Sequence, residues 1–251
     1  MRERIAAGGL ALGLGLRQAR TVDIGRAMAT AGVDWLFVDL EHSSMPLDVA
    51  VQISVAAADA GIAPIVRVPA GDFGLACRAL DGGAHGIVMP HVDDPEQAAA
   101  FVRACRYPPA GVRGVTTALP HTAFAPLPLA EGLERSEADV LLIAMVETEE
   151  AAAHADAIAS TPGLDGIMVG TQDLSVEVGR PGDITSEPVA AAVATTIEAC
   201  NRHGKLVGLG GVGDPALLLR YHEQGVHFGL IGSDLSLLMA AVSARVAALR
   251  P

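Results

Sequence analysis

Short apolar segments recur at regular intervals along the chain and are separated by longer segments with helical periodicity. The apolar segments, rich in valine, isoleucine and leucine, are residues 10–16, 35–39, 64–68, 86–89, 140–146, 166–169, 206–210 and 228–232. The amphipathic segments are residues 22–31, 46–60, 72–80, 95–106, 149–159, 188–203, 214–224 and 236–249. Apolar runs that alternate with helices are typical of parallel strands buried on both faces.

The number of these units favours a closed barrel over an open sheet. Eight strands, each followed by a helix, within 251 residues match the size of a (β/α)8 TIM barrel. No linker or shift in composition divides the chain, so we predict an α/β fold with a single domain over residues 1–251. Residues 107–137 fall outside the pattern. They are rich in proline and glycine, and we expect a long loop that serves as a lid or as an oligomer contact.

Charge and cysteine content narrow the classes of function. The formal net charge is −12 and no basic stripe is present, which argues against nucleic acid or an anionic membrane as a partner. No apolar run reaches the roughly 18 residues that a membrane-spanning helix needs. The three cysteines are far apart and form no CxxC motif, so we do not expect a disulfide framework. We expect a cytoplasmic location, where cysteines stay reduced.

Two carboxylates follow neighbouring strands of the predicted barrel. In this fold catalytic groups lie at the carboxyl ends of the strands, where Glu147 follows the fifth strand and Asp173 the sixth. Two carboxylates, completed by water and substrate oxygens, are a common way to hold Mg²⁺ or Mn²⁺. The alternative is that Asp173 caps a helix and that Glu147 is an acid favoured in the first helical turn. We predict that together they bind a metal.

A histidine and an arginine follow two other strands. His42 is the candidate base, because the pKa of free imidazole lies near neutrality, and Asp39 or Asp81 is the acid expected to orient it. The alternative is that His42 is merely hydrogen-bonded. Arg67 ends an apolar strand and needs an anion there, either a substrate oxygen or, in a structural salt bridge, Asp39 or Glu41.

Several stretches resemble one enzyme family. They are DWLFVDLEH at residues 34–42, RYPPAGVRG at residues 106–114, Glu147-Thr148, and Gly170 with Asp173-Leu174-Ser175. The chain resembles the HpcH/HpaI family of class II pyruvate-dependent aldolases from about residue 13 to residue 249. The family often has glutamine where this chain has Met145, and Gly-Pro near Thr171 and Gln172. These two departures leave the preference for the oxo acid and the aldehyde open.

The resemblance implies a role for each strand-end residue. His42 matches the catalytic base, held by Asp39 or Asp81, and Arg67 matches the arginine on the pyruvyl oxygen. Glu147 and Asp173 match the metal ligands, and the backbone N–H groups of Gly170, Thr171, Gln172 and Asp173 match the site for the pyruvate carboxylate. Family members are typically hexamers, so we expect a homo-oligomer.

The function predicted from these residues is the reversible cleavage of 4-hydroxy-2-oxo acids to pyruvate, or a close analogue, and an aldehyde, with Mg²⁺, Mn²⁺ or Co²⁺ as cofactor. A Schiff-base aldolase needs a strand-end lysine, whereas Lys205, the only lysine, precedes the seventh strand. A lyase of malyl- or citryl-CoA type should need a cationic surface for the nucleotide. A non-catalytic 2-oxo-acid binding protein would have no use for His42.

Overall fold

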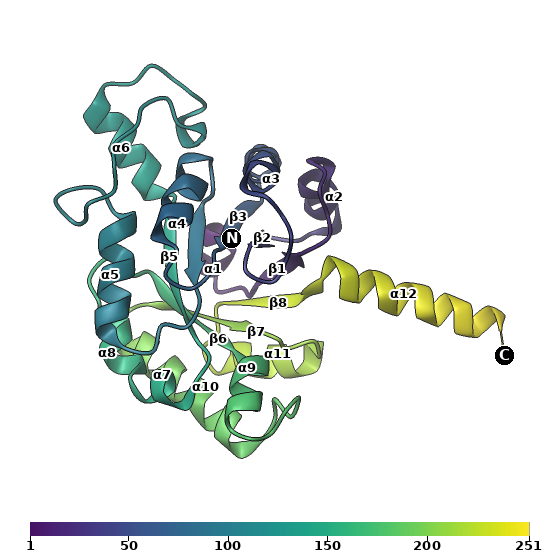
Figure 1. Ribbon diagram of the computed structural model, residues 1–251. Helices are drawn as coiled ribbons and strands as arrows, with labels where there is room; N and C mark the ends of the chain where they lie inside the picture. Colours follow the sequence, from purple (N-terminus) through teal and green to yellow (C-terminus); the bar gives the residue numbers. More distant parts are fainter. Residues whose placement is uncertain (251) are drawn as a thin grey trace.

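The computed structural model describes residues 1–250 and contains a closed barrel of eight parallel strands, β1 to β8, in which β8 pairs with β1 (Figure 1). The strands are β1 (Ala11–Leu16), β2 (Trp35–Asp39), β3 (Ala63–Arg67), β4 (Gly86–Met89), β5 (Leu141–Val146), β6 (Gly166–Gly170), β7 (Leu206–Gly210) and β8 (Phe228–Ser233). The predicted TIM barrel is confirmed, and no strand end differs from its prediction by more than one residue.

Helices precede, connect and follow the strands, and most of them lie around the outside of the barrel. They are α1 (Arg2–Ala6), α2 (Asp23–Ala31), α3 (Leu47–Asp59), α4 (Phe73–Asp81), α5 (Pro95–Cys105), α6 (Leu129–Ala138), α7 (Glu149–Ala153), α8 (Ala155–Ala159), α9 (Thr171–Glu177), α10 (Glu187–Arg202), α11 (Pro215–Glu223) and α12 (Asp234–Leu249), with a short 3-10 helix η1 (Pro120–Thr122). The helix predicted over residues 149–159 is two helices, α7 and α8, which meet at His154.

Large apolar side chains fill the interior of the barrel. Trp35 packs edge-on against Phe37 and Phe228, with ring centroids 6.2 and 5.6 Å apart. Gly13 and Gly208 make room for these rings, because a Cβ atom at Gly13 would lie 2.1 Å from Trp35 and one at Gly208 would lie 2.1 Å from Phe228. The interior is therefore a packed core, as in other barrels of this kind.

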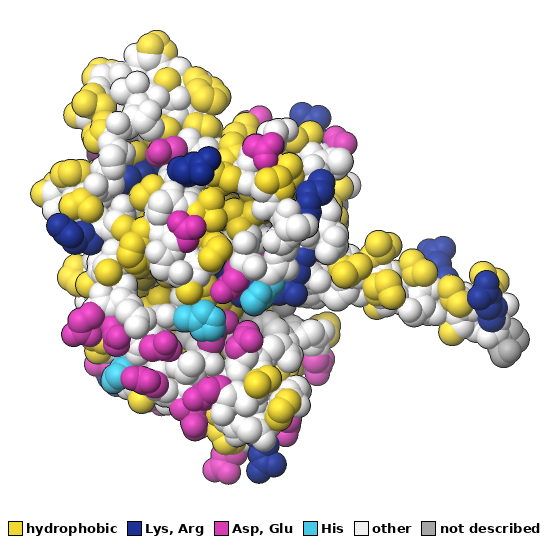
Figure 2. Space-filling model, in the orientation of Figure 1, with side chains coloured by type: hydrophobic (Ala, Val, Ile, Leu, Met, Phe, Trp, Pro, Cys, Tyr) yellow, Lys and Arg dark blue, Asp and Glu magenta, His cyan; other side chains and the backbone are white. Residues whose placement is uncertain are grey.

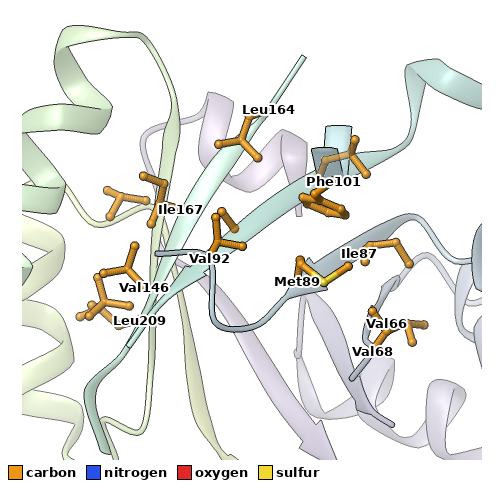
Figure 3. Packing of buried hydrophobic residues seen from close by; sticks show 14 of the residues in the cluster. Val66, Val68, Ile87, Met89, Val92, Phe101, Val146, Leu164, Ile167 and Leu209 are labelled. Carbon is orange, nitrogen blue, oxygen red and sulfur yellow. The ribbon is translucent and has the colours of Figure 1, made fainter. Parts of the chain in front are cut away.

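A second layer of core lies between the barrel and the helices. Val66, Ile87, Val146 and Ile167 point outward from their strands into this layer, where Phe101 of α5 joins them (Figure 3). The strands from β2 to β7 are thus buried on both faces almost throughout, which explains why they read as unbroken apolar runs rather than as alternating ones.

The prediction of one long loop over residues 107–137 is wrong in two respects. Part of the segment is helical, since η1 lies within it and α6 begins at Leu129, where Glu131 and Arg135 pair across one turn. It also packs at the amino-terminal end of the barrel, because His121 Nε2 lies 3.0 Å from the carbonyl oxygen of Ala84, just before β4. The segment therefore cannot serve as a lid over the carboxyl-terminal mouth.

The last helix extends away from the barrel. Figure 1 shows α12 projecting from the end of β8, and Figure 2 shows hydrophobic side chains along it. None of its residues is buried, and Leu238 and Leu249 are 60% and 82% exposed. Within residues 1–250, no helix combines the length and the hydropathy needed to span a membrane.

Candidate active site

Three charged side chains are buried at the carboxyl ends of β2, β3 and β5. Asp39 ends β2 and is in register with Arg67, which ends β3, while Glu147 follows β5 directly. All three are buried, although charged groups rarely are. Their burial places them over the apolar barrel interior, so that their charges act in a poorly solvated environment.

Asp39 and Arg67 form a bidentate ion pair. Arg67 Nε donates to Asp39 Oδ1 at 3.1 Å and Nη2 donates to Oδ2 at 2.7 Å. Burial alone raises the pKa of Asp39, but the hydrogen bond and charge of Arg67 outweigh it and hold that pKa below its usual value. Burial alone likewise lowers the pKa of Arg67, but the hydrogen bond and the charge of Asp39 outweigh it, so that the pKa of Arg67 is raised. Both groups stay charged at neutral pH.

Glu41 extends this network toward the mouth of the barrel. Its Oε2 lies 3.1 Å from Arg67 Nη1 and 3.8 Å from His42 Nε2, and its Oε1 lies 3.9 Å from His91 Nε2. Both salt-bridge partners considered for Arg67, Asp39 and Glu41, are therefore present. Phe37 supports the guanidinium group from the barrel interior, with Arg67 Cζ 5.1 Å from the centre of its ring.

The acids that were predicted to orient His42 do not contact its ring. Asp39 Oδ1 accepts a hydrogen bond from the backbone N–H of His42 at 3.1 Å, which fixes the backbone and leaves the half-exposed ring beside Glu41. Asp81 ends α4, at the opposite end of the barrel, where Arg113 Nη2 donates to it at 2.7 Å. Within one chain, Asp81 is therefore a structural partner of Arg113.

Glu147 is a buried carboxyl group with little compensating charge. Its side chain is 2% exposed; His91 donates a backbone N–H to Oε2 at 3.2 Å, and the half-exposed His91 ring lies 3.7 Å away. Burial, aided by the charge of Asp173, raises the pKa of Glu147 to about 7, although the backbone N–H of His91 and the charge of Arg67 act in the opposite direction. A buried carboxyl group with a second carboxylate nearby is electrostatically suited to a cation.

The predicted metal pair has no third protein ligand beside it. In the part of the chain that the structure describes, residues 1–250, no three His, Cys, Asp or Glu side chains are grouped to hold a metal ion. Asp173 is exposed in the first turn of α9, whereas Glu147 is buried. Such an arrangement fits a hard cation that takes most of its ligands from water and substrate oxygens.

The start of α9 forms the floor beside Glu147. Gly170 precedes the helix, and a Cβ atom there would lie 2.7 Å from Glu147 Oε1, so the position has room only for glycine. Thr171 Oγ1 donates to the carbonyl oxygen of Gly210 at 2.8 Å, and Gln172 Nε2 donates to that of Gly211 at 3.0 Å. These bonds tie α9 to the end of β7. Binding of a carboxylate by this segment stays a prediction.

One arginine at the mouth was missed from the sequence. Arg17 directly follows β1, and its Nε donates to Asp39 Oδ2 at 2.8 Å. The signal was available, because Arg17 continues the inward-facing positions 11, 13 and 15 of β1. Glu41 likewise continues the inward positions Trp35, Phe37 and Asp39 of β2.

Comparison with known proteins identifies the family. The sequence profile of HpcH/HpaI aldolase/citrate lyase matches residues 18–241. The chain belongs to this family.

Among relatives of this HpcH/HpaI family protein are two named aldolases. A 4-hydroxy-4-methyl-2-oxoglutarate aldolase of Hapsidospora irregularis is 36% identical over 94% of this chain and 88% of its own. A hydroxypyruvate/pyruvate aldolase of Pseudomonas aeruginosa is 39% identical over 85% of this chain and 79% of its own. An HpcH/HpaI aldolase from Desulfitobacterium hafniense has the same fold, with a TM-score of 0.94 and 28% identity over 100% of this chain and 96% of its own. The resemblance predicted from the motifs is confirmed, and these relatives support lyase activity.

Proposed function

We propose that the protein is a divalent-metal-dependent class II aldolase, which reversibly cleaves 4-hydroxy-2-oxo acids to pyruvate, or a close analogue, and an aldehyde. The observation that carries the proposal is the buried Glu147, whose charge is only partly compensated, beside Asp173 and near the Asp39–Arg67 ion pair. One side of the mouth thus needs a cation, and the other offers N–H donors to oxygen. A chelating 2-oxo acid is a substrate that satisfies both sides. The named aldolases among the relatives support the same reaction class.

Glu147 and Asp173 would hold the metal, which supplies Lewis-acid stabilisation of the negative charge that develops on the 2-oxo oxygen. Arg67 adds fixed positive charge at that oxygen. Asp39 accepts hydrogen bonds from Nε and Nη2, while Nη1 lies 3.1 Å from Glu41 Oε2 and donates to the sulfur of Met145 at 4.0 Å, so the second N–H of Nη2 remains for a substrate oxygen. Because Asp39 locks the plane of the guanidinium group, Arg67 needs little reorganisation during the reaction.

His42 is positioned to move the proton of the 4-hydroxyl group. In cleavage, its imidazole accepts that proton as the aldehyde carbonyl forms and the bond between C3 and C4 breaks, the electron pair of that bond passing to the 2-oxo oxygen as an enolate; a proton from solvent then adds to C3 and gives pyruvate. In synthesis, it returns the proton to the new alkoxide. The backbone hydrogen bond to Asp39 fixes the backbone that carries the ring, and Glu41 Oε2 lies 3.8 Å from Nε2.

Schiff-base chemistry has no residue to carry it. Lys205 precedes β7 at the amino-terminal end of the barrel, where its Nζ donates to the carbonyl oxygen of Leu164 at 2.7 Å. The site at the opposite end therefore lacks an amine that could condense with a ketone.

The proposal is tested by removing the metal. Treatment with EDTA should abolish the formation of pyruvate from 4-hydroxy-2-oxo acids, and Mg²⁺, Mn²⁺ or Co²⁺ should restore it. Borohydride added with pyruvate should leave the activity unchanged, because no imine forms. Full activity in a metal-stripped sample, or inactivation by borohydride, would contradict the proposed mechanism.

We also propose that the protein is a homo-oligomer, with α12 as a contact. The helix carries apolar side chains along its length and buries none of them within its own chain. A helix that is apolar all round is stable only when it is covered. The hexameric state implied by the family resemblance is part of this proposal.

A further inference from the structure

A cavity of about 300 Å³ opens beside the Asp39–Arg67 pair, between β1 and the ends of β7 and β8. Its lining includes Arg17, Phe37, Gln172, Gly211, Leu230 and Ser233. Arg17 is the only charged residue among the lining residues that the structure describes. The cavity is therefore a glycine-rich space with apolar side chains, a few neutral polar ones and a single cation.

The cavity borders the site proposed for the oxo acid. Arg17 shares Asp39 with Arg67, because Arg17 Nε and Arg67 Nη2 both donate to Oδ2 of that carboxylate, at 2.8 and 2.7 Å. Phe37 lies between the cavity and Arg67, and Gln172 precedes Asp173. A second reactant placed in the cavity is thus next to the carbon atom that a 2-oxo acid would present.

Arg17 is held in place and keeps donors free. Asp234 accepts the backbone N–H groups of Gln18 and Ala19 at 2.8 and 2.7 Å and that of Arg17 at 3.2 Å, so the loop after β1 is fixed to the start of α12. The Arg17 side chain is 45% exposed, and within residues 1–250 its Nη1 and Nη2 donate to no protein acceptor. These two nitrogens form a fork that matches a carboxylate.

We propose that this cavity binds the carbonyl acceptor and that Arg17 selects acceptors which carry a carboxylate group. This assignment rests on the proposed aldolase function and specifies its substrate class. The preferred substrates are then 4-hydroxy-2-oxo acids with a second carboxylate at the far end. The planar guanidinium group, anchored at Nε by Asp39, holds that carboxylate and so orients the aldehyde or ketone carbon toward the oxo acid.

The test compares carboxylated and neutral acceptors at saturating pyruvate: glyoxylate against glycolaldehyde, and succinic semialdehyde against butanal. In Arg17→Gln, kcat/KM for the carboxylated acceptors should fall about 10- to 100-fold, the usual size of a lost charged hydrogen bond. For the neutral acceptors it should change less than about threefold. Arg17→Lys should keep part of the preference, because it retains the charge without the fork. Arg26→Gln removes one positive charge from the exposed face of α2 and should leave the preference unchanged.

Other outcomes overturn the assignment in different ways. Equal losses with both classes of acceptor, or weaker binding of pyruvate alone, would place Arg17 in the oxo-acid site instead. The wild-type protein gives a test that does not depend on the folding of a variant: at saturating pyruvate, propionate should compete with butanal, and lack of competition would contradict the assignment. Exchange of the pyruvate methyl protons in D2O reports on the oxo-acid half without an acceptor. If neither exchange nor product appears with any acceptor, the aldolase proposal fails, and this assignment fails with it.

Discussion

Glu147 links the electrostatics of the site to the stability of the fold. Burial raises its pKa to about 7 from an ordinary value of 4.5, so between these values the folded state binds more protons than the unfolded state. The free energy of unfolding of the metal-free protein should therefore fall as the pH rises from 4.5 to 7. Glu147→Gln removes this loss and should stabilise the metal-free protein at pH 8 by up to about 3 kcal/mol, with little effect at pH 4.

Urea unfolding in EDTA at both pH values measures this effect of Glu147. Glu150→Gln, at an exposed position on α7, is the matched control and should change little. Mg²⁺ should raise the melting temperature of the wild-type protein at pH 8 and not that of Glu147→Gln. A variant less stable than the wild type at pH 8 would show that the carboxylate is already compensated.

His42 should matter for the chemical step and not for binding of the oxo acid. His42→Ala should lower kcat for cleavage by about 10²–10⁴, the usual loss for a general base, while the inhibition constant of pyruvate stays nearly constant. His154→Ala, which removes an exposed ring on the α7–α8 junction, is the control. An unchanged kcat in His42→Ala would remove this residue from the mechanism.

Site residues that end an apolar strand, or directly follow one, could be predicted from the sequence. Asp39, Arg67 and Glu147 end or directly follow apolar strands, and the structure brings all three to the mouth. The pairing of side chains was not predictable, because it depends on the tertiary packing of loops. Asp81 illustrates this, since its partner Arg113 comes from the segment whose fold the sequence pattern did not reveal.

At the level of elements, the strands and the long helices were predicted well, and the short connections were not. A continuous apolar run between helices predicts a buried parallel strand directly. The formation of short helices such as α6 and α9 depends instead on contacts with neighbouring elements, which the local sequence does not reveal. The segment at residues 107–137 contains enough proline and glycine to suggest a loop, yet α6 begins directly after Pro128, which is its N-cap residue. Composition averages over such a segment and hides the helix inside it.

The glycines of the barrel interior should be sensitive to the smallest substitution. Gly13→Ala places a Cβ atom 2.1 Å from the Trp35 ring, which β1 and β2 hold in a packed interior, so it should destabilise the fold by about 1–3 kcal/mol or more. The control is Gly132→Ala in α6, where the nearest atom to the new Cβ lies 4.0 Å away, and it should stabilise the fold by roughly 0.5–1 kcal/mol. Chemical denaturation measures both changes. Equal stability of Gly13→Ala and the wild type would mean that Trp35 can move aside.

At the scale of the whole molecule, α12 is the helix whose apolar side chains are not buried within the chain. In a (β/α)8 barrel each helix covers the outside of the strands beside it, whereas α12 leaves β8 only half-buried over most of its length. The exposed apolar residues of α12 are Leu235, Leu237, Leu238, Met239, Val242, Val246 and Leu249. The outside of β8 is thus only partly covered by helices, and the apolar side chains of α12 have no surface of their own chain to pack against. A second copy of the chain offers both, because each copy can cover the barrel of the other with its own α12.

Charge on the apolar positions of α12 should therefore break the assembly. Leu238 and Val242 lie one turn apart on the helix, and the double substitution Leu238→Glu and Val242→Glu would bury two carboxylates in an oligomer contact. We expect the wild-type protein to sediment as an oligomer whose melting temperature rises with protein concentration, and the double variant to sediment as a smaller species with a lower melting temperature. The control is Ser243→Glu, which adds one charge at an exposed polar position of the same helix. It should assemble like the wild-type protein, and weaker assembly would show that the side of α12 that carries Ser243 is also in the contact. Analytical ultracentrifugation of the three proteins measures the masses directly. A monomeric wild type, or an unchanged mass in the double variant, would show that α12 is not the contact and that its apolar residues are exposed to solvent.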